Sequence, residues 1–349
     1  MVFRKNSVSL INSYLSNRKQ QVKIGSVTSD WDTIHKGVPQ GSILGPLLFN
    51  VFINDIFLFV DKCTLYNYAD DNTLSYIHHD FDTLVNVLER ESGLLIDWFK
   101  VNRMQANPEK FQALAVGKRT FSKTPVFTID SVLVPCEESV KLLGIEIDYQ
   151  LNFDAHIKSI CRKASQQLNV LKRIGRYLSK LNKLTIFHSF ILSNFNFCPL
   201  AWYFCSKRNS QKLEKIQERS LRFIYNDKES TYEQLMMKAQ VSSLEVKRMR
   251  NMAIETFNIL YGLSPACLND LVSFKESNYN FRYKNILNIP KVRTTAFGKN
   301  SVRYAAAILW NRLPEHIRSM SNFNQFKNVI LMWNGKDCGC QMCKNDNAM

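Results

Sequence analysis

Residues 64–77 read TLYNYADDNTLSYI, and this stretch sets the expectation for the fold around it. The runs Thr64–Tyr68 and Thr73–Ile77 have the composition of two short strands, and Ala69-Asp70-Asp71-Asn72 between them has the composition of a turn. Adjacent aspartates in a straight strand point to opposite faces, whereas at the tip of a hairpin their carboxylates can converge. The sequence therefore predicts a β-hairpin with an acidic tip at Asp70 and Asp71.

Two carboxylates held close together repel one another and lose hydration, so a cation stabilises such a pair. Mg²⁺ prefers carboxylate oxygen, and two such ions about 4 Å apart could activate an attacking hydroxyl and stabilise a leaving oxygen. The alternative is a solvated turn, because Asp-Asp is common in turns. Asp70 and Asp71 alone do not separate these two interpretations.

A glycine- and proline-rich loop, Gly37-Val38-Pro39-Gln40-Gly41, precedes the hairpin and leads through Gly45 and Pro46 into an apolar helix expected over Leu47–Leu58. Glycines allow close approach of a ligand, and free N–H groups at a helix entry could face phosphates or a base. The alternative is a plain helix-entry turn.

The rest of the first 150 residues shows alternating helical and extended patterns. Asp80 is expected to cap a long amphipathic helix that ends before Asn107-Pro108. A helix is expected over Phe3–Leu15, and strands over Gln21–Ile24, Thr33–His35, Phe111–Val116, Val126–Ile129 and Val140–Ile147.

Taken together, the loop and the hairpin resemble two motifs of LINE-type (non-LTR) retrotransposon reverse transcriptases. Residues 37–49, GVPQGSILGPLLF, resemble the loop-and-helix motif of that family, and Tyr68-Ala69-Asp70-Asp71 resembles its catalytic hairpin. Order and spacing match as well. Further resemblances lie at Ser13–Arg18, Asn107–Lys110 and Lys141–Gly144, and the later stretches Cys198–Trp202 and Ala307–Pro314 resemble the region after the polymerase in jockey-like elements.

The resemblance implies an α+β fold. Residues 1–150 would form a partial right-hand polymerase palm, an antiparallel sheet with helices. Residues 151–265 would form a basic helical thumb-like region, and 266–349 a C-terminal helical region with a cysteine-rich tail. The implied activity is RNA-directed DNA polymerisation, with an RNA template, a DNA primer or target, and dNTPs as partners.

The resemblance also implies roles for individual residues. Asp70 and Asp71 would hold Mg²⁺ (or Mn²⁺), and Lys110 would act as general acid toward departing pyrophosphate. Leu143 and Gly144 would grip the primer terminus. Template and nucleotide would contact Gly37, Pro39, Gln40, Gly41, Tyr68 and Ala69.

Right-hand polymerases use three carboxylates, and the first lies upstream of the segment that begins near Ser9. Only eight residues precede that segment, and none is Asp or Glu. We therefore expect a chain truncated at its N-terminus, without fingers or first palm motif, and inactive or nearly so by itself. The alternative function is a non-catalytic nucleic-acid-binding remnant of the polymerase.

Charge is distributed unevenly along the chain, whose net charge is +16. Residues 1–150 carry 15 Lys and Arg against 17 Asp and Glu, while residues 151–349 carry 31 against 13. Such a polycation suits nucleic acid, although a generic basic surface or contact with anionic membranes would also explain it. One helical stripe, which could contact phosphates or simply be solvated, comprises Lys212, Lys215, Arg219 and Arg222.

The nine cysteines have irregular spacings, so we expect reduced thiols and an intracellular protein of the nucleus or cytoplasm. Cys338, Cys340 and Cys343 have spacings compatible with Zn²⁺, for which Asp337 or a distant residue would be the fourth ligand. A reduced, partly disordered tail is the favoured interpretation. His78-His79 is similarly interpreted as surface. The most apolar run, Leu44–Val60, is interrupted by polar residues and predicts a buried helix rather than a membrane span.

Overall fold

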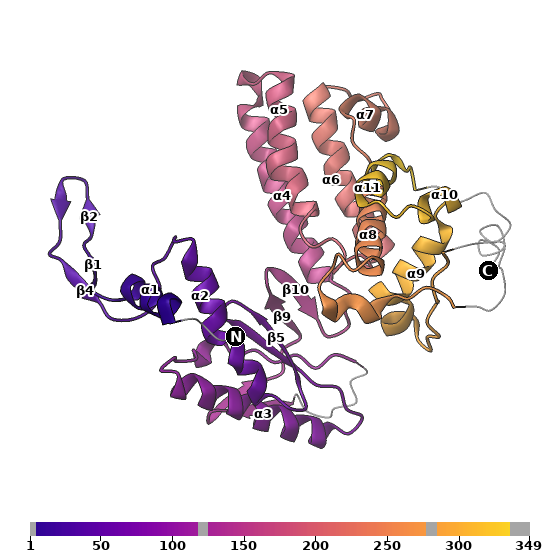
Figure 1. Cartoon of the computed structure of the whole chain (residues 1–349). Coiled ribbons are helices and arrows are strands. Elements are labelled where there is room, and N and C mark those ends of the chain that lie inside the picture. Colours follow the sequence, from indigo (N-terminus) through magenta and orange to yellow (C-terminus); the bar gives the residue numbers. More distant parts are fainter. Residues whose placement is uncertain (1–4, 118–124, 277–284, 336–349) are drawn as a thin grey trace. The chain divides into compact units, whose positions relative to one another are not determined.

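The computed structural model describes residues 5–117, 125–276 and 285–335, which divide into two compact units (Figure 1). The first unit comprises residues 1–112 and 124–135, and the second comprises 113–123 and 136–349. Helices and short antiparallel ladders occur in both. The fold is therefore α+β, as predicted.

The first unit begins with helix α1 (Lys5–Leu15) and four short strands, β1 (Arg18–Gln20), β2 (Lys23–Ile24), β3 (Val27–Thr28) and β4 (Asp32–Ile34). Then come helix α2 (Leu44–Ile53), the 3₁₀ helix η1 (Asn54–Phe59), and strands β5 (Thr64–Tyr68) and β6 (Asp71–Ser75). Helix α3 (Phe81–Val101), the 3₁₀ turn η2 (Pro108–Lys110), and strands β7 (Val126–Ile129) and β8 (Val132–Pro135) complete the unit.

One small core organises the first unit. Ile53 and Ile56 of α2 and η1 pack with Leu95 and Trp98 of α3, and partly buried residues of the hairpin join them. Trp98 donates its Nε1–H to Asp55 Oδ1 at 3.1 Å, which fixes η1 on α3. Asp80 caps α3 as predicted, since its Oδ2 accepts from the Thr83 amide at 2.9 Å.

The second unit opens with strands β9 (Ser139–Leu142) and β10 (Ile145–Asp148), followed by helix α4 (Asp154–Ile174). Then come η3 (Gly175–Tyr177), α5 (Lys180–Ile186), the π-helix η4 (Phe187–Ile191) and η5 (Leu192–Phe195). Helices α6 (Lys207–Tyr225), α7 (Tyr232–Ala239) and α8 (Leu244–Leu260) follow. The last elements are η6 (Ala266–Leu271), η7 (Thr295–Lys299), α9 (Val302–Arg312), α10 (Glu315–Arg318) and α11 (Phe323–Met332).

Two apolar cores hold the second unit together. The first lies between α4, η4, α6 and α7, where α4 and α6 run side by side (Figure 1). The second lies between α8, α9 and α11 and contains Phe257, Trp310 and Phe326. Helix α8 belongs to both, because Leu244 at its start is buried in the first core and Met252 onward in the second.

The structure corrects several predicted strands. In the described residues the named strands pair only two at a time, as β1–β4, β2–β3, β5–β6, β7–β8 and β9–β10. Residues Val140–Ile147 do not form one strand, because Leu143 and Gly144 turn the chain into a hairpin. The strand predicted over Phe111–Val116 is reduced to a single bridge between Ala113 and Cys136.

Other boundaries shift by a few residues. The helix predicted over Leu47–Leu58 starts at Leu44 and passes into a 3₁₀ helix after Ile53. The predicted turn of four residues is a loop of two, Ala69 and Asp70, so that Asp71 already lies in a strand. No helix of the described residues is long and apolar enough to cross a membrane.

Candidate polymerase site

The acidic hairpin is a regular antiparallel pair in which Tyr68 lies opposite Asp71. Ala69 has a φ of 53°, the left-handed conformation that a two-residue loop requires at its first position. Two amide side chains brace the loop: Asn67 donates to the Ala69 carbonyl at 2.8 Å, and Asn72 donates to the Asp70 carbonyl at 3.2 Å. The tip therefore has one defined backbone geometry.

The two faces of the hairpin differ. Leu65 and Leu74 pack on the core formed by α2, η1 and α3, whereas Tyr66 and Tyr68 are 58% and 67% exposed. Cross-strand partners share a face, so Asp71 lies on the exposed face with Tyr68. The hairpin thus presents an open surface of aromatic and acidic groups.

The carboxylates at the tip are available to a ligand. Asp70 and Asp71 are both exposed, and no ion pair in the described residues involves either of them. Two neighbouring carboxylates suit an oxygen-preferring divalent cation. Within the described ranges, however, no group of three or more His, Cys, Asp or Glu side chains could hold a metal. The tip therefore fits part of a metal site.

A residue outside the predicted site fixes the base of the hairpin. Glu91 of α3 is fully buried, and its Oε2 accepts from the amides of Asp61, Lys62 and Cys63 at 2.9, 3.1 and 3.2 Å. Those amides lie directly before β5, which begins at Thr64. Glu91 therefore sets where the strand that leads to Asp70 starts.

The charge of Glu91 is maintained in spite of its burial. Burial opposes ionisation, but hydrogen bonds from Arg90 and the three amides outweigh it and lower the pKa of Glu91. Arg90 donates to Oε1 at 2.6 Å from a half-exposed position. A signal for Glu91 does exist in the sequence, because it lies four residues from both Val87 and Leu95 on the buried stripe of α3.

The loop before α2 is held by its own polar groups. Arg18 donates to the Gly37 carbonyl at 2.5 Å, and the Ser42 hydroxyl donates to the Pro39 carbonyl at 2.7 Å. Gly37 and Gly41 have φ values of 74° and 79°, conformations that favour glycine. Gly45 is packed so closely that an added Cβ would lie 2.9 Å from Ser42 Oγ. Because α2 shares a core with the hairpin, one core supports both predicted motifs.

The remaining predicted substrate residues lie in different places. Gln40 and Lys110 are exposed residues of the first unit, on the loop before α2 and in η2. Leu143 and Gly144 lie in the second unit, at the turn between β9 and β10, with φ values of 46° and 86°. Two positive φ values in a two-residue loop are the type I′ pattern. The catalytic and binding roles of these residues stay predictions.

The basic stripe of α6 is only partly open. Lys212, Lys215 and Arg219 are exposed. Arg222 is half-buried, donates to Glu218 Oε1 at 2.6 Å, and donates to the carbonyls of Lys228 and Ser230 at 3.1 and 3.0 Å. Its guanidinium therefore holds the loop after α6 in place.

The candidate zinc ligands Cys338, Cys340 and Cys343 lie outside the described residues. The six cysteines within them are thiols rather than disulfides. His78 and His79 are exposed, and His78 Nδ1 accepts from the Asp80 amide at 3.1 Å, beside the start of α3.

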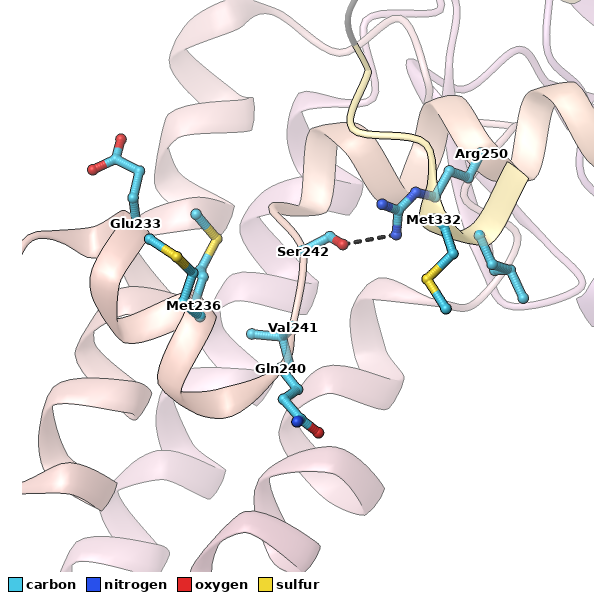
Figure 2. A pocket seen from close by; sticks show the side chains of 9 residues that line it. Glu233, Met236, Gln240, Val241, Ser242, Arg250 and Met332 are labelled. Carbon is cyan, nitrogen blue, oxygen red and sulfur yellow. Dashed lines mark hydrogen bonds between the residues drawn. The ribbon is translucent and has the colours of Figure 1, made fainter. Parts of the chain in front are cut away.

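A hollow of about 430 Å³ lies between α7 and α11, and Figure 2 shows side chains that line it. Apolar side chains including Met236, Val241 and Met332 line it, and Arg250 donates to Ser242 Oγ there at 2.7 Å. It contains no residue of the predicted site.

Similarity to known proteins is found mainly in the first part of the chain. Residues 2–147 match the family model described as reverse transcriptase (RNA-dependent DNA polymerase). The chain is 27% identical over 226 residues to a probable RNA-directed DNA polymerase from transposon BS of Drosophila melanogaster, covering 62% of this chain and 25% of that protein. It is 26% identical over 228 residues to the RNA-directed DNA polymerase from the mobile element jockey of the same species, covering 62% and 24%.

The chain thus spans about a quarter of the length of these curated relatives. No solved structure matches it. The motif order, the acidic hairpin and the relatives agree on one family. Residues 2–147 thus match the reverse transcriptase family, and the chain is similar to the RNA-directed DNA polymerases of LINE-type, jockey-like retrotransposons.

Proposed function

We propose that this chain takes part in RNA-directed DNA synthesis, with residues 1–150 as part of a polymerase palm and the basic helices after 150 as a thumb. The observation that carries the proposal is the hairpin tip, where Asp70 and Asp71 are exposed beside Tyr68 and free of ion pairs in the described residues. Its partners are an RNA template, a DNA primer and dNTPs.

In this proposal each motif has a chemical task. The primer 3′-hydroxyl loses its proton to solvent water as its oxygen bonds to the α-phosphorus of the dNTP, and the bond from that phosphorus to pyrophosphate breaks. Lys110 gives a proton to the departing pyrophosphate. Gln40 and Gly41 line the template and nucleotide pocket, while Leu143 and Gly144 position the primer end. Mg²⁺ held by Asp70 and Asp71, in a two-metal arrangement, would stabilise charge on the attacking and leaving oxygens.

A second candidate function is binding of nucleic acid without synthesis. The observation that favours it is that no third acidic side chain joins Asp70 and Asp71 in the part of the chain that the structure describes. Loss of a metal ligand lowers a polymerase rate by orders of magnitude, so we expect slow extension, or none, from the chain alone.

A primer-extension assay separates the two candidates. The chain is incubated with dNTPs, Mg²⁺ or Mn²⁺, and a labelled DNA primer annealed to RNA. Nucleotide addition that Asp70→Asn abolishes supports the polymerase. The matched control is Asp97→Asn, an exposed aspartate on α3 that should leave addition unchanged. Salt-dependent binding of the hybrid without addition supports the second candidate, and equal addition by wild type and Asp70→Asn rejects the role of Asp70.

A further inference from the structure

The second unit contains a cleft of about 560 Å³ between the β9–β10 hairpin, α4 and the segment that follows η4. Three features of its lining suit a nucleotide: an exposed aromatic ring, cations, and hydrogen-bonding groups. The residues that carry them are Lys141, His156, Ser159, Lys163, Asn194 and Phe197. The volume lies within the usual range for small-ligand sites.

Phe197 carries an exposed ring that packs against a neighbouring turn. Its side chain is 52% exposed. A Cβ added to Gly144 would lie 3.4 Å from Phe197 Cε1, so the ring packs against the turn between β9 and β10. The Phe197 carbonyl accepts from Nε1 of the buried Trp202 at 3.2 Å. An exposed aromatic ring that packs against a turn, in a segment whose backbone is also hydrogen-bonded, is suited to stacking on a base.

The polar groups of the cleft are oriented as well. Lys141 and Lys163 are exposed, and neither is in an ion pair of the described residues. Asn194 donates its Nδ2 to Gln167 Oε1 at 2.6 Å, which leaves Oδ1 as its acceptor. His156 Nδ1 accepts from the Glu146 amide at 3.4 Å, so the neutral ring carries its proton on Nε2.

Glu146 is the acidic residue of the lining and lies opposite Lys141 in the β9–β10 ladder. Its Oε1 accepts from the Ser139 hydroxyl at 3.3 Å. A carboxylate here can accept an N–H of a base, while the two lysines attract the phosphates. The cleft thus combines stacking, hydrogen bonding and charge.

We propose that this cleft binds one unpaired nucleotide of a single-stranded RNA or DNA segment, with its base stacked on Phe197 and its phosphates beside Lys141 and Lys163. The inference rests on the proposed function, because it assigns part of the nucleic-acid surface of that polymerase. A paired base does not fit the role, since its faces are covered by its neighbours in the stack.

The test measures binding of the full chain to a labelled oligo-dT strand and to an abasic strand of the same length, by fluorescence anisotropy. Phe197→Ala should weaken oligo-dT binding about tenfold and leave abasic-strand binding unchanged, because only the base stacks. Phe197→Trp should restore binding. Lys163→Ala should weaken binding of both strands and reduce the salt slope by about 0.7.

Matched controls come from the same unit. Phe190→Ala removes a phenylalanine of similar exposure outside the lining, and Lys158→Ala removes an exposed lysine of α4 outside it. Both should leave binding unchanged. Equal effects of Phe197→Ala and Phe190→Ala, or equal loss on both strands for Phe197→Ala, would overturn the proposal. Strong competition by free dTMP would instead assign the cleft to a free nucleotide.

The binding experiment on Phe197 and the primer-extension assay can succeed or fail independently of each other. If Asp70-dependent extension occurs while Phe197→Ala changes nothing, this inference fails and the proposed polymerase stands. If Phe197→Ala selectively weakens oligo-dT binding while no extension occurs, the inference stands and the synthesis proposal fails. Thermal unfolding of each variant confirms that it is folded.

Discussion

At the scale of single residues, Glu91 is the clearest case of a side chain that supports a site without belonging to it. Glu91→Ala would leave three amides before β5 without their acceptor, in a buried position. We expect a loss of about 3 kcal/mol in the free energy of unfolding, because buried donors would be unpaired. Urea unfolding measures it. The control Asp97→Asn should change it by less than about 0.5 kcal/mol.

The same residue predicts a dependence on pH. Folding lowers the pKa of Glu91 below its ordinary value of 4.5, so its ionised form contributes stability above that value. This contribution is lost as the pH falls through the lower pKa of the folded state. Unfolding midpoints measured from pH 7 to pH 3 should fall less for Glu91→Gln than for wild type. An identical slope for both proteins would contradict the assignment.

At the scale of elements, the sequence predicted those helices and turns whose formation depends on residues close together in the chain. The acidic hairpin, the Asp80 cap, the long helix α3 and the basic helix α6 are all present. The local pattern predicted one strand over Val140–Ile147 and only the family resemblance indicated a turn there, since Leu143 adopts a positive φ that local propensity disfavours. The contacts of Glu91 with residues about 30 positions away, and the stabilisation of Phe197 by Gly144 and Trp202, are likewise tertiary.

Two substitutions in the β9–β10 turn should change the free energy of unfolding in opposite directions. Leu143→Asn creates Asn-Gly, the pair that type I′ turns favour, and should raise the free energy of unfolding by about 1 kcal/mol. Gly144→Ala should lower it, because φ is 86°, a conformation that residues with a Cβ rarely adopt. Thermal unfolding measures both. If Leu143→Asn also weakens primer–template binding while gaining stability, the strained leucine serves binding; a destabilised Leu143→Asn would contradict the turn assignment.

At the scale of the whole molecule, charge and compactness divide the chain at neighbouring places. The excess of Lys and Arg begins after residue 150, whereas the compact units separate near Pro135. The hairpin β9–β10 therefore belongs to the helical unit in structure, although the family match extends to residue 147. The extent of the family match depends on the motifs that the chain shares with the family, whereas the boundary of the compact unit depends on which side chains pack together. The end of the family match and the boundary of the compact unit therefore differ. The predicted three-part division into palm, thumb and C-terminal region stays a prediction.

The charge division predicts how binding depends on salt. Each phosphate contact contributes about 0.9 to the slope of log affinity against log salt for a duplex. Reversing the exposed Lys215 and Arg219 of α6 to Glu should therefore weaken binding of a primer–template hybrid and reduce that slope by about 1.8. Lys23→Glu, an exposed lysine of β2 in the near-neutral half, is the control and should change neither. Binding titrations at several salt concentrations measure the affinity and its salt slope for each protein. A slope that the double variant leaves unchanged would mean that this stripe of α6 is solvated surface, and that the hybrid is held by other cations of the basic half.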